Sequence, residues 1–140
     1  MIIDAENLIA GRLGTFVAKK ALMGEKVDIV NAEKAVIVGK KEDILGRYKQ
    51  KYDRRTFFKG PYTPKMPDRL LRRLIRGMLP YEKARGKEAF KRIMCWIGVP
   101  DKFKNENIEK LDRVNVTKTK NIRYLSIKDI CKYLGGRYGG

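Results

Sequence analysis

Four arginines fall on one side of a predicted helix near the middle of the chain. The helix begins at Pro67 and Asp68, since proline suits the first helical turn and a carboxylate suits the positive end of the helix dipole. At 3.6 residues per turn, one stripe carries guanidiniums and the opposite stripe carries leucine, isoleucine and methionine. The arginines are Arg69, Arg72, Arg73 and Arg76. Guanidiniums repeated at this spacing suit successive phosphates of a nucleic acid.

The alternative interpretation of these arginines is an ordinary solvated helix face. Such faces usually mix signs, because an acid near each Lys or Arg stabilises the helix. Here Asp68 is the only acid between residues 65 and 81. Like charges at these spacings repel each other, so the pattern favours a partner that carries negative charge.

The excess positive charge is concentrated in the middle third of the chain. The whole sequence of 140 residues has 33 Lys or Arg against 16 Asp or Glu, a net charge of +17. Residues 47–92 hold sixteen of those basic residues and four of the acids, a net of +12. A compact body with this charge repels itself unless a polyanion neutralises it. The distribution therefore indicates nucleic-acid binding rather than solubility alone.

The residues that usually carry catalysis or metals are scarce. There is no histidine, and the single serine, Ser126, is explained by helix capping. Cys95 and Cys131 lie far apart and in no CxxC spacing, so we expect buried thiols rather than zinc ligands, with a disulfide as the minor alternative. We predict no enzyme activity, no cofactor and no metal site.

Two glycine-containing segments resemble phosphate-binding loops. The first, GRLG at 11–14, follows a predicted strand and opens a helix, but it does not fit the dinucleotide motif. Three interpretations remain open. Its glycines allow close packing, its backbone N–H groups hold the phosphate of a nucleotide, or they hold a phosphate of RNA with Arg12 assisting. The second, Gly39-Lys40, is not a Walker motif, since Lys34 stands where the first glycine is needed.

Strands and helices alternate along the first hundred residues. Predicted strands lie at 1–5, 27–30, 35–38 and 93–99, and predicted helices lie at 11–23, 40–48, from 67, at 82–92 and at 127–134. This order indicates an α/β domain with helices on both faces of the sheet. The link before the strand at 35–38 is too short for a helical crossover, so either that strand pairs differently or the chain kinks there.

We divide the chain into an α/β RNA-binding core, residues 1–100, and a C-terminal extension, residues 101–140. The core includes the basic loop and helices at 47–92. The extension has a short helix with a capping pair, Ser126 and Asp129, and a glycine-rich tail that we expect to be loose. With no signal peptide and no apolar run of membrane-spanning length, we expect a cytoplasmic protein.

Aromatic and basic residues interleave in an irregular segment before the arginine helix. The rings are Tyr48, Tyr52, Phe57, Phe58 and Tyr62. Core packing and stacking on unpaired bases both explain them. No helix-turn-helix, zinc finger or zipper is present, and the basic residues are spread over helices, a loop and a tail. This layout favours a folded RNA over duplex DNA.

Several motifs resemble the universal large-subunit ribosomal protein thirteen family. They are VDIVNA at 27–32, VIVGKK at 36–41, IRGMLP at 75–80, GK at 86–87 and FKR at 90–92, with DA at 4–5 and GRL at 11–13 fitting the family's opening. The resemblance covers residues 1–99. CWIGVP at 95–100 and the segment 126–133 are similar to the archaeal branch. The bacterial form has a His-rich loop near 52–61 that is absent here, so its loop contacts are not transferred.

The resemblance implies a three-layer α/β/α fold with a mostly parallel four-stranded sheet, in a structural component of the large ribosomal subunit. The implied partners are large-subunit rRNA and neighbouring ribosomal proteins. A regulator that binds mRNA and a nucleotide-dependent enzyme are the alternatives. The predicted RNA-binding residues are Arg12, Lys40, Lys41, Arg54, Arg55, Lys59, Arg69, Arg72, Arg73, Arg76, Lys83, Arg85, Lys87, Lys91, Arg92, Lys118, Lys120 and Arg137.

Overall fold

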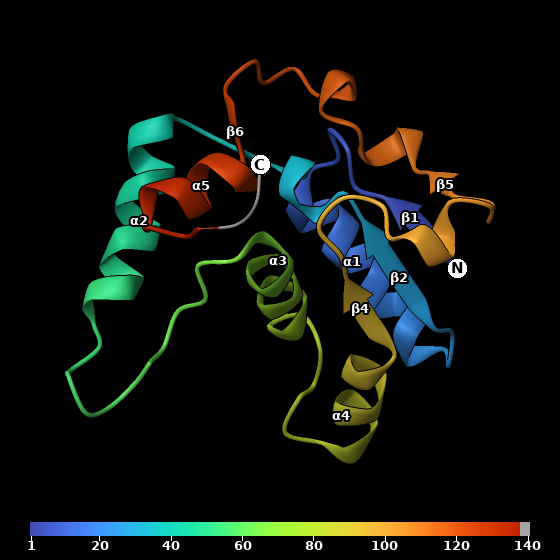
Figure 1. Ribbon diagram of the computed structural model, residues 1–140, viewed down its shortest axis with the longest axis horizontal. Coiled ribbons are helices and arrows are strands. Elements are labelled where there is room, and N and C mark those ends of the chain that lie inside the picture. Colours follow the sequence, from blue (N-terminus) through green and yellow to red (C-terminus); the bar gives the residue numbers. More distant parts are fainter. Residues whose placement is uncertain (138–140) are drawn as a thin grey trace.

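A parallel four-stranded sheet organises the chain in the computed structural model, which describes residues 1–137 (Figure 1). Its spatial order is β4-β2-β1-β5, and all three neighbouring pairs are parallel. The strands are β1, Ile2–Asp4; β2, Val27–Val30; β4, Ile93–Cys95; and β5, Glu109–Lys110. The central strand β2 is buried along its whole length, as expected for a parallel sheet covered on both faces.

Five α-helices lie within residues 1–137. Their bounds are α1, Ala10–Leu22; α2, Lys41–Asp53; α3, Pro67–Arg76; α4, Ala84–Lys91; and α5, Ile127–Tyr133. Helices α1, α3 and α4 pack beside the main sheet, whereas α2 packs against α5. Helix α1 is the crossover between β1 and β2, and it contacts both α3 and α4. Gly24 adopts a left-handed φ of 97° just after α1, the conformation in which a glycine commonly ends a helix.

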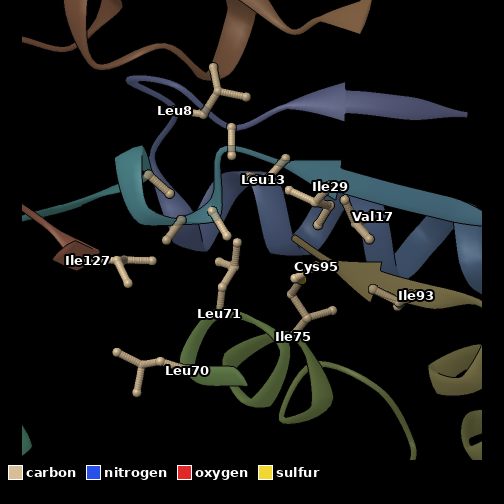
Figure 2. Close-up of a cluster of buried hydrophobic side chains, with 14 of the residues drawn as sticks. Leu8, Leu13, Val17, Ile29, Leu70, Leu71, Ile75, Ile93, Cys95 and Ile127 are labelled. Carbon is tan, nitrogen blue, oxygen red and sulfur yellow. The ribbon is translucent and has the colours of Figure 1, made fainter. Parts of the chain in front are cut away.

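The main core lies between the sheet and these helices. Figure 2 shows Leu71 and Ile75 rising from α3 toward α1 and β4, with Cys95 beside Ile75. Leu13 and Val17 of α1 face the same cluster, and all but Cys95 are completely buried. Helix α3 is therefore fixed in the core by one side, which determines the direction of its other side.

The second face of the sheet is covered by a thinner layer. Ile2 and Val30 pack there against Phe103, which lies in a 3₁₀ turn at Asp101–Phe103. Asp28 is the buried acid of β2, and its carboxylate accepts a 3.0 Å hydrogen bond from the Trp96 indole nitrogen. The α/β class and the layered arrangement are confirmed, although a turn rather than a long helix forms the third layer.

One strand prediction is decided and another needs correction. The strand expected at 35–38 is β3, Val36–Val38, and the alternative that it pairs differently is confirmed, since it pairs antiparallel with β6, Tyr124–Ser126, outside the main sheet. The strand expected at 93–99 ends at Cys95, because the backbone turns away and Gly98 takes a left-handed φ of 65°. The fourth strand of the main sheet is instead β5, which the sequence analysis missed.

The C-terminal residues share the main core. Ile127, Ile130 and Cys131 belong to the same buried cluster as α1 and α3. The predicted cap of α5 is confirmed, since Ser126 Oγ accepts a 3.2 Å hydrogen bond from the backbone N–H of Asp129. The division of the chain at residue 100 stays a prediction.

The tail was expected to be loose from residue 135 onward. Its first part is placed, because the backbone N–H of Gly136 donates a 2.8 Å hydrogen bond to the Cys131 carbonyl. A Cβ built on Gly136 would lie 2.2 Å from the Lys65 carbonyl oxygen, so the two backbones pack closely. The remainder of that prediction, residues 138–140, lies outside the described residues. Within residues 1–137, no helix has both the length and the apolar character needed to cross a membrane.

Candidate nucleic-acid interface

Helix α3 has one buried side and one charged side. Leu71 and Ile75 are completely buried, while Arg69, Arg73 and Arg76 are exposed. The apolar positions recur at helical spacing and bind the helix to the core, which leaves these arginines directed outward. The predicted orientation of the helix is therefore confirmed for three of its four arginines.

The exposed arginines are not neutralised by the protein's own acids. In the part of the chain that the structure describes, the ion pairs are Lys20–Glu25, Lys34–Glu6 and Lys104–Asp101. None of them involves a residue of the basic region 47–92. The positive charge of this region is thus available to an external anion.

Arg72 differs from its neighbours on the stripe. Its Nε donates a 2.9 Å hydrogen bond to the Ile93 carbonyl, and its Nη2 donates a 3.2 Å hydrogen bond to the Phe90 carbonyl. The side chain is only partly exposed, and its guanidinium lies 4.0 Å from the centre of the Phe90 ring. Arg72 therefore joins α3 to the end of α4 and the start of β4, and the fold uses two of its five donors.

Two adjacent hollows flank the exposed side of α3, and we call them together the basic groove. The first, about 620 Å³, lies at the end of α3 beside the segment that leads to α4, and it is lined by Arg73, Arg76, Gly77, Leu79, Pro80, Tyr81, Glu82 and Lys83. The second, about 350 Å³, lies between α2 and α3 and is lined by Tyr48, Lys51, Arg54, Pro61, Thr63, Leu70, Arg73, Leu74 and Gly77. Arg73 and Gly77 line both, so the two hollows adjoin each other at α3.

One aromatic ring orients an arginine within the groove. The Arg76 guanidinium lies 3.9 Å from the centre of the Tyr81 ring, a cation–π distance that favours a fixed side-chain position. Sequence reasoning missed Lys51 and Tyr81 as lining residues. Lys51 sits inside the basic region and carried that signal, whereas nothing in the sequence shows that Tyr81 faces Arg76.

The remaining predicted residues are distributed more widely. Lys83, Arg85, Lys87 and Lys91 are exposed on or beside α4. Arg92 is partly buried, and its Nη1 donates a 3.1 Å hydrogen bond to the Ala21 carbonyl.

Lys40 and Lys41 line a separate hollow of about 340 Å³ at the start of α2. Arg123, which was not among the predicted residues, lines the same hollow. Arg54, Arg55 and Lys59 are exposed on the loop after α2. Arg12, Lys118, Lys120 and Arg137 are exposed and line none of these hollows.

The aromatic residues before α3 divide into two groups. Tyr48 and Tyr52 lie on α2 and pack against the main core. Burial raises the pKa of Tyr48, while the neighbouring Lys65 side chain lowers the pKa of Tyr52. Phe57, Phe58 and Tyr62 are exposed. Core packing therefore explains two of the rings, and three are free of the core.

The segment at 11–14 and the crevice near β1 do not favour a nucleotide. The hollow beside the carboxyl ends of β1 and β5 measures about 140 Å³, and its charged lining residues are three acids, Asp4, Glu6 and Asp112, and one cation, Lys110. Asp4 Oδ1 already accepts hydrogen bonds of 3.0 Å from the Glu6 N–H and 2.9 Å from the Asn31 amide. Glu6 is paired with Lys34, but the charged lining still has more acids than cations, which disfavours a phosphate in this hollow.

The glycines of this segment have a packing role at one position. A Cβ on Gly14 would lie 2.9 Å from the Met78 sulfur, so this glycine allows α1 to approach the end of α3. Nothing lies within 4 Å of a Cβ on Gly11. Close packing, the first of the three interpretations, thus applies to Gly14.

The fold and the basic groove define an α/β protein that presents uncompensated cations to a polyanion. Among residues 1–137, no three Cys, Asp or Glu side chains converge as metal ligands would. Both cysteines are free and buried. The uncompensated positive charge on one side of the fold is the feature expected of a protein that binds nucleic acid.

Comparison with known proteins identifies the family. Residues 1–102 match the family described as Ribosomal protein L13. The chain is 42% identical over 137 residues to "Large ribosomal subunit protein uL13" of Archaeoglobus fulgidus, covering 97% of this chain and 88% of that protein. It is 45% identical over 135 residues to the protein of the same name from Thermoplasma volcanium, covering 96% and 98%. The chain belongs to the Ribosomal protein L13 family, which confirms the resemblance and its archaeal character.

Proposed function

We propose that this chain is a structural constituent of the large ribosomal subunit and that it binds large-subunit rRNA through the basic groove. The proposal rests on one observation about α3. Its arginines Arg69, Arg73 and Arg76 point outward and form no ion pair, while the opposite side of the helix is buried in the core. It acts in the cytoplasm as part of the ribosome, beside other ribosomal proteins, and it is not an enzyme. Its relatives are named as large-subunit proteins.

The binding mechanism is positional. Each phosphate neutralised by Lys or Arg releases condensed counter-ions, which supplies affinity without reading sequence. Arg69, Arg73 and Arg76 form the centre of the contact, with the basic residues of α4 on one flank and Arg54, Arg55 and Lys59 on the other. Arg72 serves mainly to hold α3 against α4. Lys40, Lys41, Lys118, Lys120, Arg12 and Arg137 extend the contact beyond the groove.

The test replaces Arg69, Arg73 and Arg76 together with alanine and measures binding to a large-subunit rRNA transcript at several salt concentrations. We expect weaker binding and a flatter dependence on salt, by about 0.7 to 0.9 of a slope unit per lost phosphate contact. The matched control removes the exposed charges of Lys19, Lys26 and Arg113, which line neither hollow of the groove. An equal effect of both triple variants would contradict a localised interface.

A regulatory role on an mRNA would use the same groove, since phosphate contacts do not separate one folded RNA from another. Sedimentation of cell extracts distinguishes the two roles. A subunit protein travels with the large particle, whereas a regulator stays near the top of the gradient.

A further inference from the structure

A projecting loop, which we call the arm, joins α2 to α3 and comprises residues 54–66 (Figure 1). Phe57 and Phe58 lie on the arm with 92% and 83% of their surfaces exposed. Neither ring belongs to any of the buried clusters. Two adjacent phenylalanines this exposed, in a protein that buries most of its other large apolar side chains, indicate a surface that binds a partner.

The arm holds the two rings out by its own hydrogen bonds. The backbone N–H of Thr56 donates a 3.0 Å bond to the Lys59 carbonyl, and the Lys59 N–H donates a 3.1 Å bond to Thr56 Oγ1. These bonds close a turn with Phe57 and Phe58 at its two central positions. The rings are therefore presented before any partner binds, which lowers the entropic cost of ordering them.

The base of the arm is tied to the basic groove. Arg73 Nη1 donates a 2.6 Å hydrogen bond to the Tyr62 carbonyl, and the Tyr62 hydroxyl donates 3.3 Å to the Phe58 carbonyl. Arg73 also lines both hollows of the groove. An RNA strand that contacts Arg73 thus lies next to the root of the arm.

The surroundings of the rings are positive. Residues 54–65 contain Arg54, Arg55, Lys59 and Lys65 and no acid. The rings themselves are edge-to-face, with centroids 5.0 Å apart and planes at 89°. Ring faces in perpendicular planes do not form one flat apolar patch, but each can receive a separate planar group.

We propose that Phe57 and Phe58 stack on unpaired bases of the RNA whose phosphates occupy the basic groove. This inference rests on the proposed function and adds the bases as the partner of the arm. An aromatic ring flanked by cations matches a nucleotide, because the base covers the ring while its phosphate meets a cation. Stacking needs bases outside a helix, so the arm selects a single-stranded loop, bulge or junction.

An apolar pocket on a neighbouring protein is the competing occupant. Protein interfaces bury apolar cores from which lysine is depleted, whereas Lys59 follows the ring pair directly. The charge of the arm therefore favours RNA, and the experiment below separates the two.

The test uses the full chain with Phe57→Leu and Phe58→Leu together, which keeps apolar volume but removes the π faces. We expect binding to a large-subunit rRNA transcript to weaken by about tenfold or more, because leucine has no π face on which a base can stack, with an unchanged dependence on salt. Phe57→Tyr with Phe58→Tyr should bind like the natural protein. Met23→Ala, an exposed apolar residue outside the arm, is the control.

Ultraviolet irradiation of the complex adds a direct readout. We expect Phe57 or Phe58 to be joined to bases that are unpaired in the transcript. The proposal is overturned if the leucine variant binds the transcript normally but enters the large subunit poorly, since the rings then contact a protein. It is also overturned if neither assay changes, or if the tyrosine variant loses as much affinity as the leucine variant.

The same experiment keeps the two proposals apart. Loss of binding in the arginine triple variant with no loss in the leucine variant leaves the groove intact as the RNA site and removes only the arm inference. No loss in either variant removes the proposed function as well.

Discussion

The guanidinium of Arg72 lies 4.0 Å from the centre of the Phe90 ring and donates a hydrogen bond to the Phe90 carbonyl, so one arginine of the α3 stripe belongs to the fold rather than to the surface. Helical spacing places it with Arg69 and Arg73, yet its neighbours give it another role. Four residues of one type on one stripe therefore do not act alike.

Replacing Arg72 with alanine should lower the free energy of unfolding by about 2 kcal/mol, because hydrogen bonds from a charged group to Ile93 and Phe90 and a cation–π contact are lost. Arg69→Ala, in an exposed position on the same helix, should leave stability within about 0.5 kcal/mol. Urea unfolding measures both. Equal stability losses in the two variants would show that Arg72 has no special structural role.

A glycine governs the approach of α4 to the segment after α3. A Cβ on Gly86 would lie 2.0 Å from the Pro80 carbonyl oxygen and 2.4 Å from its carbon, and backbone atoms do not move aside readily. Gly86→Ala should therefore cost at least about 2 kcal/mol of stability, comparable to overpacking in a core. Gly46→Ala, within α2 and with nothing within 4 Å, should instead stabilise by about 0.5–1 kcal/mol. Thermal unfolding of both variants checks the sign of each change.

Stability should fall with alkaline pH partly through Cys95. Burial raises the pKa of its thiol from 9.0 to about 12. Above pH 9 the unfolded chain releases this proton while the folded chain keeps it, so the contribution to stability is complete below pH 9 and is lost as pH rises toward 12. The slope from one such thiol approaches about 1.4 kcal/mol per pH unit.

The matching measurement compares the natural protein with Cys95→Ala by urea unfolding from pH 8 to pH 11 under reducing conditions. The alanine variant should show a shallower decline over this range. Parallel curves for the two proteins would mean that the thiol ionises equally in both states.

The C-terminal third should be needed for cooperative folding. Ile127, Ile130 and Cys131 are almost wholly buried in the main core, and β5 covers the edge of β1. A chain that ends at residue 100 should therefore lose its sharp thermal transition. A retained sharp transition would instead support an independently folded core at residues 1–100. Calorimetry on the short and full chains decides this.

Much of the fold was predictable because it follows apolar periodicity. The α1 and α3 helices and the β2 strand carry patterns that match their burial. The bounds of α1 and β2 and the start of α3 agree closely with the prediction. Strand β5 has no such pattern. It is two residues long, its side chains are charged and exposed, and edge strands of this kind are shielded by charge rather than marked by hydrophobicity.

The candidate site was predictable in its charge but not in its contacts. Composition identified the region 47–92, and helical spacing identified the outward side of α3. The pairing of β3 with β6 and the bonds of Arg72 to Ile93 join residues far apart in the chain, which no local pattern encodes. The aromatic rings differ in burial for a similar reason. Tyr48 and Tyr52 share the face of α2 that packs against the core, while Phe57 and Phe58 come after the helix has ended.

The position of α5 against α3 has a consequence for synthesis. The arginines of α3 leave the translating ribosome well before α5, whose residues complete the core beneath them. An incomplete chain therefore carries all the arginines of α3 on a core that has not finished folding. Only a completed polypeptide should offer those charges at fixed spacing, so partial products should compete poorly for a place in a growing particle.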